Sequence, residues 1–172
     1  LDSTPSDLSV EDRWILSEFA DTMQKVEDAW NNLDIYTATQ ALKTFGTGIL
    51  PSHWLEMSKS RLYDEDANAA WTIHRIVRDL MAALSPVCPF FTHHISSTLY
   101  GVSAVDVREF PQRTPDDESL RSLTNAIEEF NGATWRTKKE AGLSLNVPIS
   151  GIVIPDELSE FSTILTQMHK LE

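Results

Sequence analysis

Aromatic and basic side chains stand close together at two places in this sequence, around Trp54 and around Trp135. This combination can hold single-stranded RNA, because unstacked bases lie against aromatic rings while lysine and arginine neutralise the phosphates. A tryptophan on a helix is also a common core residue, so both interpretations stay open at this point. The candidate RNA-binding residues are Lys43, Trp54, Lys59, Arg61, Arg136, Lys138 and Lys139.

A short motif at Met57-Ser58-Lys59-Ser60 resembles the K-M-S-K-S loop of class I aminoacyl-tRNA synthetases, in which lysines stabilise the pyrophosphate of ATP. The context argues against that chemistry. Glu56 precedes the motif where the loop has a lysine, the four residues lie inside a helical pattern between Trp54 and Leu62, and the companion H-I-G-H sequence is absent. We therefore expect no catalytic residue here.

The histidines do not have the spacing of a metal site. His93 and His94 are adjacent, whereas two ligands on one helix face must be three or four residues apart. Cys88 is the single cysteine, which excludes an internal disulfide. No glycine-rich phosphate loop and no Ser/His/Asp set has a recognisable context. The expectation is a chain without a catalytic site, a metal or a cofactor of its own.

The net charge argues against nucleic acid, but its distribution does not. The chain has 172 residues, of which 14 are Lys or Arg and 26 are Asp or Glu, giving a net charge of −12. Residues 1–34 hold nine acids and two bases, residues 35–100 are balanced, and residues 136–139 form a short basic stretch. A local basic surface could therefore lie on an acidic body; the alternative is charge spread over solvated helix faces.

No apolar run approaches the roughly 18 residues of a membrane span. Arg75, Arg78 and Asp79 interrupt the richest candidate. The sequence begins at Leu1 with neither an initiator Met nor a signal peptide. We expect a cytoplasmic piece of a longer chain, with no membrane and no DNA partner.

Apolar residues recur at three- and four-residue steps through most of the chain, which predicts amphipathic helices. Ser9 and Asp34 precede the first two stretches and are suited to cap them. The run 46–51, with two glycines and a proline, is expected to interrupt the second stretch and begin a further segment. The acidic turn 64–66 lies at the positive end of the next helix, and Gly101 is a natural helix stop.

Two short strands are expected where apolar residues alternate or cluster, at 105–110 and 149–154. The predicted fold class is mainly α. An antiparallel bundle of four to five helices occupies residues 1–101, and a small α/β appendage, with two short strands plus helices, occupies residues 102–172 and packs on the bundle. Such short strands need each other and a helix to be stable.

Four segments resemble, in order, the anticodon-binding helical bundle of the class I aminoacyl-tRNA synthetases for valine, isoleucine, leucine and methionine. The most specific is L-x-P-x-x-P-F-x-T at 84–92. The others are D-x-W-I-L-S at 12–17, the pair D-I-Y-x-A at 34–38 with W-L-E-x-x-K-x-R-L at 54–62, and Ser103 with Phe110-Pro111. His93-His94 departs from the family, which has an acidic pair after the threonine.

The resemblance implies that this chain contacts the anticodon arm of tRNA and carries no catalytic site. The catalytic domain of the same chain, which uses ATP and Mg²⁺ for aminoacylation, would lie upstream. The segment 135–143 looks most like the valyl branch, with isoleucyl the closest rival. An aromatic at the position of Trp54 belongs to the anticodon site in methionyl relatives. Two alternatives remain, a helical protein-interaction bundle without RNA binding and a free-standing enzyme or metal protein.

Overall fold

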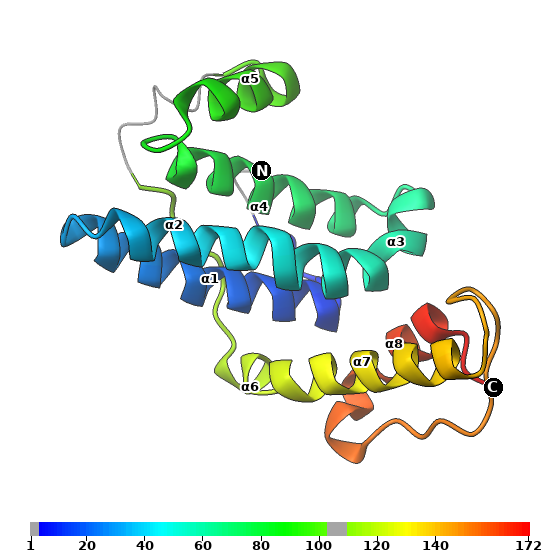
Figure 1. The fold of residues 1–172 in the computed structure, drawn as a ribbon. Helices are drawn as coiled ribbons and strands as arrows, with labels where there is room; N and C mark the ends of the chain where they lie inside the picture. Colours follow the sequence, from blue (N-terminus) through cyan, green and yellow to red (C-terminus); the bar gives the residue numbers. More distant parts are fainter. Residues whose placement is uncertain (1–3, 103–109) are drawn as a thin grey trace.

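The fold is taken from a computed structural model that describes residues 4–102 and 110–172. It is mainly helical, as the sequence predicts (Figure 1). The elements are α1 (Val10–Asn31), α2 (Ile35–Thr44), the π-helical η1 (Phe45–Trp54), α3 (Leu55–Tyr63), α4 (Ala67–Leu84), α5 (Pro89–Tyr100), α6 (Glu118–Arg121), α7 (Thr124–Glu140), the 3₁₀-helical η3 (Asp156–Phe161) and α8 (Ser162–His169). Across these two ranges, no helix has the length and apolar character needed to cross a bilayer.

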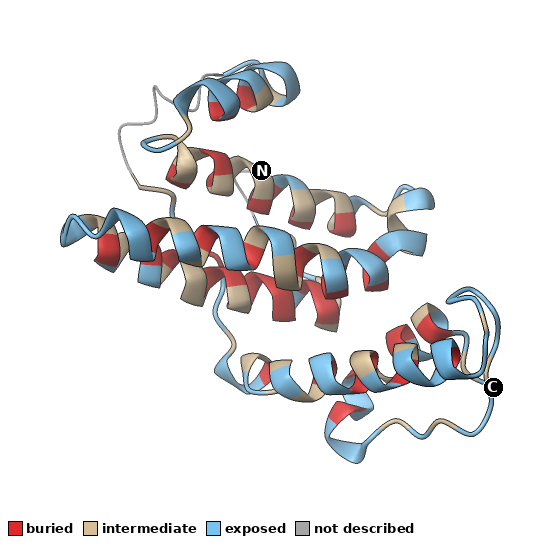
Figure 2. Cartoon of the chain, in the orientation of Figure 1, coloured by how far each residue is buried: buried red, intermediate tan, exposed pale blue. Residues whose placement is uncertain are grey.

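Helix α1 is the central element of the bundle. Ser9 begins it as predicted, because its hydroxyl accepts a hydrogen bond from the backbone N–H of Asp12 at 3.4 Å. The helix contacts α2, α4, α6 and η3, so buried side chains occur along more than one of its faces (Figure 2). Trp14 and Phe19 are among them, at 0% and 1% exposure. Burying aromatic area on this scale is the main stabilisation available to a small helical domain.

One continuous helical run extends from Ile35 to Tyr63, where a break at 46–51 was expected. Pro51 lies inside the run, although it has no N–H for the usual bond to residue i−4. The chain adapts by widening into a π-helix, in which the backbone N–H of Leu55 donates to the carbonyl of Leu50, five residues back. The α-helix is thus interrupted around 46–51 as expected, but by a π-helical segment that keeps the run continuous, which the sequence did not predict.

Helix ends in the bundle follow their sequence signals. Asp34 caps α2 and Asp66 caps α4, each by accepting backbone N–H bonds at 2.9 to 3.0 Å. Gly101 ends α5 with φ +68°, a left-handed conformation that a glycine adopts without steric cost. Helix α5 packs against α4, which packs against α1.

The C-terminal part rests on the bundle through α6 against α1 and α8 against α3. The indole N–H of Trp14 donates to Thr124 Oγ1 at 2.9 Å, and its ring meets Phe161 edge-on at 6.3 Å. Two residues after Trp14 on α1, the carbonyl of Leu16 accepts a hydrogen bond from the hydroxyl of Thr114 at 2.7 Å. These contacts hold α7 across one end of the bundle. The predicted boundary between residues 101 and 102 stays a prediction.

The expected strands are the part of the fold class that the structure corrects. The strand at 149–154 is wrong, because this segment makes a single parallel bridge, from Ile149 to Leu171. Its alternation is nonetheless real: Ile152 and Ile154 pack on the core while Val153 is 83% exposed. A lone extended segment with no neighbouring strand satisfies that pattern without a sheet. Most of the strand expected at 105–110 lies outside the described residues.

Candidate nucleic-acid interface

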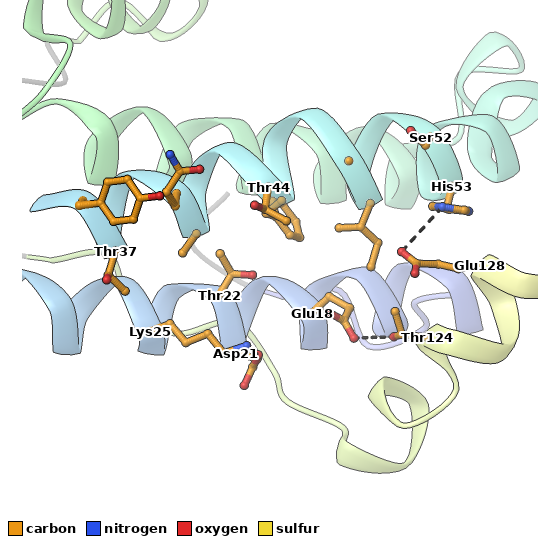
Figure 3. A pocket seen from close by; sticks show the side chains of 16 residues that line it. Glu18, Asp21, Thr22, Lys25, Thr37, Thr44, Ser52, His53, Thr124 and Glu128 are labelled. Atoms are coloured by element: carbon orange, nitrogen blue, oxygen red, sulfur yellow. Dashed lines mark hydrogen bonds and ion pairs between the residues drawn. The ribbon is translucent and has the colours of Figure 1, made fainter. Parts of the chain in front are cut away.

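A groove of about 610 Å³ lies between α1 and the α2–η1 run, and α7 closes one end (Figure 3). Helical spacing places residues 18, 21, 22 and 25 of α1 on one face, opposite a matching row on α2 and η1. The polar residues that line the groove are Glu18, Asp21, Thr22, Lys25, Tyr36, Thr37, Gln40, Thr44, Ser52, His53, Thr124 and Glu128. A cavity of this size, with a mainly apolar surface and several polar groups, is of the kind that holds a small ligand or a nucleobase.

The acidic wall of the groove, on α1, is partly neutralised. Asp21 pairs with Lys25 at 2.6 Å and with Arg121 at 2.8 Å. Burial raises the pKa of Glu18, although the hydroxyl of Thr124, which donates to its carboxylate at 2.5 Å, acts in the opposite direction. The two ion pairs of Asp21 reduce the repulsion that RNA phosphates would meet at this wall.

The opposite wall supplies uncharged groups that are open to a ligand. The side chains of Gln40 and Ser52 have no hydrogen-bond partner within the described part of the chain, and both line the groove. Tyr36 lines it as well and is 74% exposed. Amide and hydroxyl groups can pair with base edges, and an exposed tyrosine ring offers a base a stacking surface.

At the end closed by α7, a buried polar network meets the groove. Asn131 lies between two histidines, 3.0 Å from His53 Nδ1 and 2.7 Å from His169 Nε2. Burial lowers the pKa of His53, against the pull of Glu128, and lowers the pKa of His169 to about 4. Both imidazoles are therefore neutral at pH 7. No sequence pattern predicts this network, because its two hydrogen-bonded pairs are 78 and 38 residues apart in the chain.

Trp54, a predicted stacking residue, is in the core. Its side chain is 0% exposed, and its indole N–H donates to Asp12 Oδ1 at 3.1 Å. No ring face is left for a base. The correction has a clear physical cause, since the side chain satisfies both its apolar area and its single donor inside the bundle.

Arg61 was predicted to bind phosphate. It lies on α3 and instead links this helix to α1 and to the start of α4. Its guanidinium contacts Glu11 at 2.6 Å, Asp12 at 2.7 Å and Asp66 at 3.2 Å, and its side chain is only 18% exposed. Burial alone would lower the pKa of Arg61, but the hydrogen bonds to Asp12 and Asp66 outweigh it and raise that pKa. A phosphate would have to displace three carboxylates, so we correct this residue to a structural role.

Lys138 is likewise structural. It is 0% exposed, and its ammonium donates to the carbonyls of Leu145, Val147 and His169 at 2.7, 2.8 and 2.6 Å. Burial lowers its pKa, with a further contribution from Lys170. The side chain ties the loop after α7 to the end of α8, which uses all three of its donors. It has none left for RNA.

The other four candidates are exposed: Lys43, Lys59, Arg136 and Lys139. Lys59 is weakly paired with Glu56, at 3.4 Å. One turn later on the same face is Tyr63, 79% exposed, and both residues line a second, smaller depression of about 320 Å³. This exposed tyrosine, rather than Trp54, is the aromatic neighbour of Lys59. The i, i+4 spacing was a signal for it that our sequence reasoning missed.

In residues 4–102 and 110–172, no group of three or more His, Cys, Asp or Glu side chains is arranged to hold a metal ion. His93 and His94 are both exposed on α5. The groove and its surroundings offer hydrogen-bond donors and acceptors, surface cations and exposed aromatic rings. Groups of these kinds can hold the bases and phosphates of RNA.

Comparison with known proteins places these features in a family. The family model described as the anticodon-binding domain of tRNA ligase matches residues 12–153, a range that includes every residue lining the groove. The resemblance inferred from the short motifs is thereby confirmed.

Individual relatives give the same result. The chain is 35% identical over 149 residues to the valine--tRNA ligase of Saccharolobus solfataricus. The matched region covers 85% of this chain and 18% of the relative. It is 36% identical over 157 residues to that of Sulfurisphaera tokodaii, covering 86% and 19%. For the valine--tRNA ligase of Methanothrix thermoacetophila the identity is 35% over 152 residues, covering 86% and 17%. The chain thus spans less than a fifth of the length of these three relatives.

Proposed function

This chain belongs to the family of anticodon-binding domains of tRNA ligases, and we propose that it binds the anticodon arm of valine tRNA. The observation that carries the proposal is the family match over residues 12–153, which covers the helical bundle and the whole groove. The similarity to valine--tRNA ligases favours valine tRNA over isoleucine tRNA.

The geometry supports a division of labour within the RNA-binding surface. Unstacked bases would enter the groove, where Gln40 and Ser52 offer free hydrogen-bonding groups and Tyr36 offers a ring. The phosphates would be neutralised by exposed cations outside it, of which Lys43 is on α2 and Lys59 on α3. Base contacts then provide selectivity, and phosphate contacts provide position and affinity.

We propose in addition that the chain is part of a longer, cytoplasmic ligase. ATP and Mg²⁺ would be used for aminoacylation in a catalytic domain of the same polypeptide, while this domain holds the tRNA. Helix α5 supports contact with such a neighbour, because Phe90, Phe91 and Leu99 are 90%, 54% and 53% exposed. Exposed apolar groups of this kind are characteristic of an interaction surface.

The proposal is tested by titrating the 172-residue chain with the stem-loop of valine tRNA at several salt concentrations, with a stem-loop of unrelated loop sequence as reference. We expect weak binding with a log–log salt slope of about −2 to −4, which corresponds to roughly three to five phosphate contacts. Equal affinity for both RNAs, or undetectable binding at low salt by folded protein, would contradict the proposal.

Two glycines allow the groove itself to be tested. Gly48 lines it, and a Cβ built there meets nothing within 4 Å. Gly48→Leu should therefore fold and occupy the groove, weakening RNA binding by roughly tenfold or more. Gly132 on α7 is equally open but does not line the groove, so Gly132→Leu is the matched control and should bind like the wild type. A Gly48→Leu variant with unchanged affinity would move the RNA elsewhere.

A further inference from the structure

The network at the closed end of the groove fixes where its protons lie. Asn131 is 0% exposed and His169 is 1% exposed, so water cannot replace their mutual hydrogen bonds. The amide of Asn131 has one accepting oxygen and one donating nitrogen. Its Oδ1 faces His169 Nε2 at 2.7 Å, and its Nδ2 faces His53 Nδ1 at 3.0 Å.

These contacts specify the tautomer of His53. The His169 nitrogen that faces an oxygen must donate, and the His53 nitrogen that faces an NH₂ must accept. His53 is neutral because burial lowers its pKa, so its one ring proton is on Nε2. Glu128 favours the same placement: its Oε1 lies 3.8 Å from His53 Nε2, and although this is too long for a good hydrogen bond, the negative charge attracts an N–H and repels a nitrogen lone pair (Figure 3).

The ring of His53 is also held in place. It packs against Trp135 with ring centroids 5.7 Å apart and an interplanar angle of 32°. Only 9% of the residue is exposed, and it lines the groove together with Glu128. A donor that is fixed before binding loses little entropy when it engages a ligand. At 3.8 Å its contact with Glu128 is too long for a good hydrogen bond, so the N–H has capacity for a partner.

We propose that His53 reads one unstacked base of the RNA. In this role its Nε2–H donates to an acceptor atom on the base edge, and the Glu128 carboxylate accepts from a donor on the same edge. Asn131 and His169 are positioning residues that act by fixing the tautomer of His53. The proposal rests on the RNA-binding function proposed above and deepens it, because it names the residues that would make the groove selective.

A double-mutant cycle tests base reading directly. Stem-loops in which each loop nucleotide in turn is replaced by an abasic residue are titrated against the wild type and His53→Phe, which keeps a ring against Trp135 but removes the donor. We expect one abasic position to weaken wild-type binding roughly tenfold and to have little effect on His53→Phe, the other positions being unchanged in both. His94→Phe, an exposed substitution on α5, is the matched control and should reproduce the wild-type profile.

The tautomer is measured separately, by ¹⁵N NMR of the histidine rings without RNA. The wild type should show His53 protonated at Nε2. Asn131→Asp replaces the amide by a carboxylate, which accepts from both imidazoles, so His53 should become protonated at Nδ1 and the selectivity at the critical position should fall. This readout would not change if Asn131 were only a packing residue. A wild-type His53 protonated at Nδ1 would overturn the proposal even if the Asn131 variant did not fold.

The outcomes separate this inference from the function on which it rests. If the wild type binds no stem-loop, the proposed function fails and base reading fails with it. If the wild type binds, and His53→Phe keeps the same profile of abasic effects, base reading by His53 is wrong while RNA binding stands. Loss of sensitivity at every position alike would indicate a general defect and would also contradict a specific reading role.

Discussion

Acidification should destabilise this domain through His169 before most carboxylates are protonated. His169 is 1% exposed, and burial, followed by the nearby charge of Lys138, lowers its pKa to about 4. In an unfolded chain the pKa of a histidine is about 6.5. Between these values the unfolded state binds the proton and the folded state does not. The stabilisation is therefore complete above pH 6.5 and is lost as the pH falls toward 4.

The size of the effect follows from the width of that window. Each pH unit within it changes the free energy of unfolding by about 1.4 kcal/mol for one proton, so a fall from about pH 6.5 to about pH 5 costs about 2 kcal/mol. The lowered pKa of His53 acts in the same direction. Asp34, Asp66 and Asp117 have pKa values below 3.8, so their contributions are lost only at lower pH. The raised pKa of Glu18 opposes the trend.

Urea unfolding followed by circular dichroism at about pH 7.5 and about pH 5 measures this loss. His169→Gln is the informative variant, because its amide can still donate to Asn131 but does not titrate. Its stability should fall at both pH values, through lost packing on Phe130 and Trp135, and its pH dependence should be smaller than that of the wild type by about 2 kcal/mol. His94→Gln, which is exposed, is the control. An equal loss in wild type and His169→Gln would refute the reasoning.

Three further substitutions have defined outcomes. Lys138→Met keeps the aliphatic stem but leaves three carbonyls without their donor. Two of these carbonyls belong to exposed residues, so water can partly replace the ammonium. We therefore expect the free energy of unfolding, measured in urea, to fall by about 2–4 kcal/mol. Gly132→Ala, in open space within α7, should raise the free energy of unfolding by about 0.5–1 kcal/mol, and a decrease would mean that the site is less open than described. Lys59→Ala should leave stability unchanged and flatten the salt slope of RNA binding by about 0.7–0.9. Arg61→Ala should instead cost about 3–5 kcal/mol of stability, because it leaves the fully buried Asp12 without its cationic partner; the reverse ranking of these two variants would contradict the roles of Lys59 and Arg61.

The helices could be predicted because their signals are local. Ser9 and Asp34 lie directly before the residues whose N–H groups they cap, and Gly101 needs only its own backbone freedom to end α5. The π-helical stretch around Pro51 was missed because a proline has two solutions, a break or a wider turn. The choice depends on packing against α1, which local sequence does not contain.

The candidate site was predicted less well, because residue type does not reveal which face of a helix is covered. The indole N–H of Trp54 donates to Asp12, 42 residues away in the chain. The ammonium of Lys138 donates to carbonyls of the loop after α7 and of α8. Tyr36 and Tyr63, which are exposed, carry the aromatic surface that the sequence suggested for Trp54. The pattern of aromatic residues beside cations stays a prediction as a class of site, and three of its seven members, Trp54, Arg61 and Lys138, are buried or fully paired and were wrong.

The arginines and lysines of this chain differ in how often they are in ion pairs, and this difference determines which cations would be available to RNA. Among the residues that the structure describes, every arginine except Arg136 is in an ion pair, as the networks of Arg61 and Arg121 illustrate. A planar guanidinium matches two carboxylates at once, whereas a lysine ammonium on a flexible stem stays hydrated. The acidic excess thus pairs with most of these arginines, and under the proposed function mainly lysines, such as Lys43 and Lys139, would remain for the phosphates. Point-charge contacts of this kind are weak and salt-sensitive, so under the proposed function selectivity would come from the groove, where the polar groups are fixed and partly shielded from solvent.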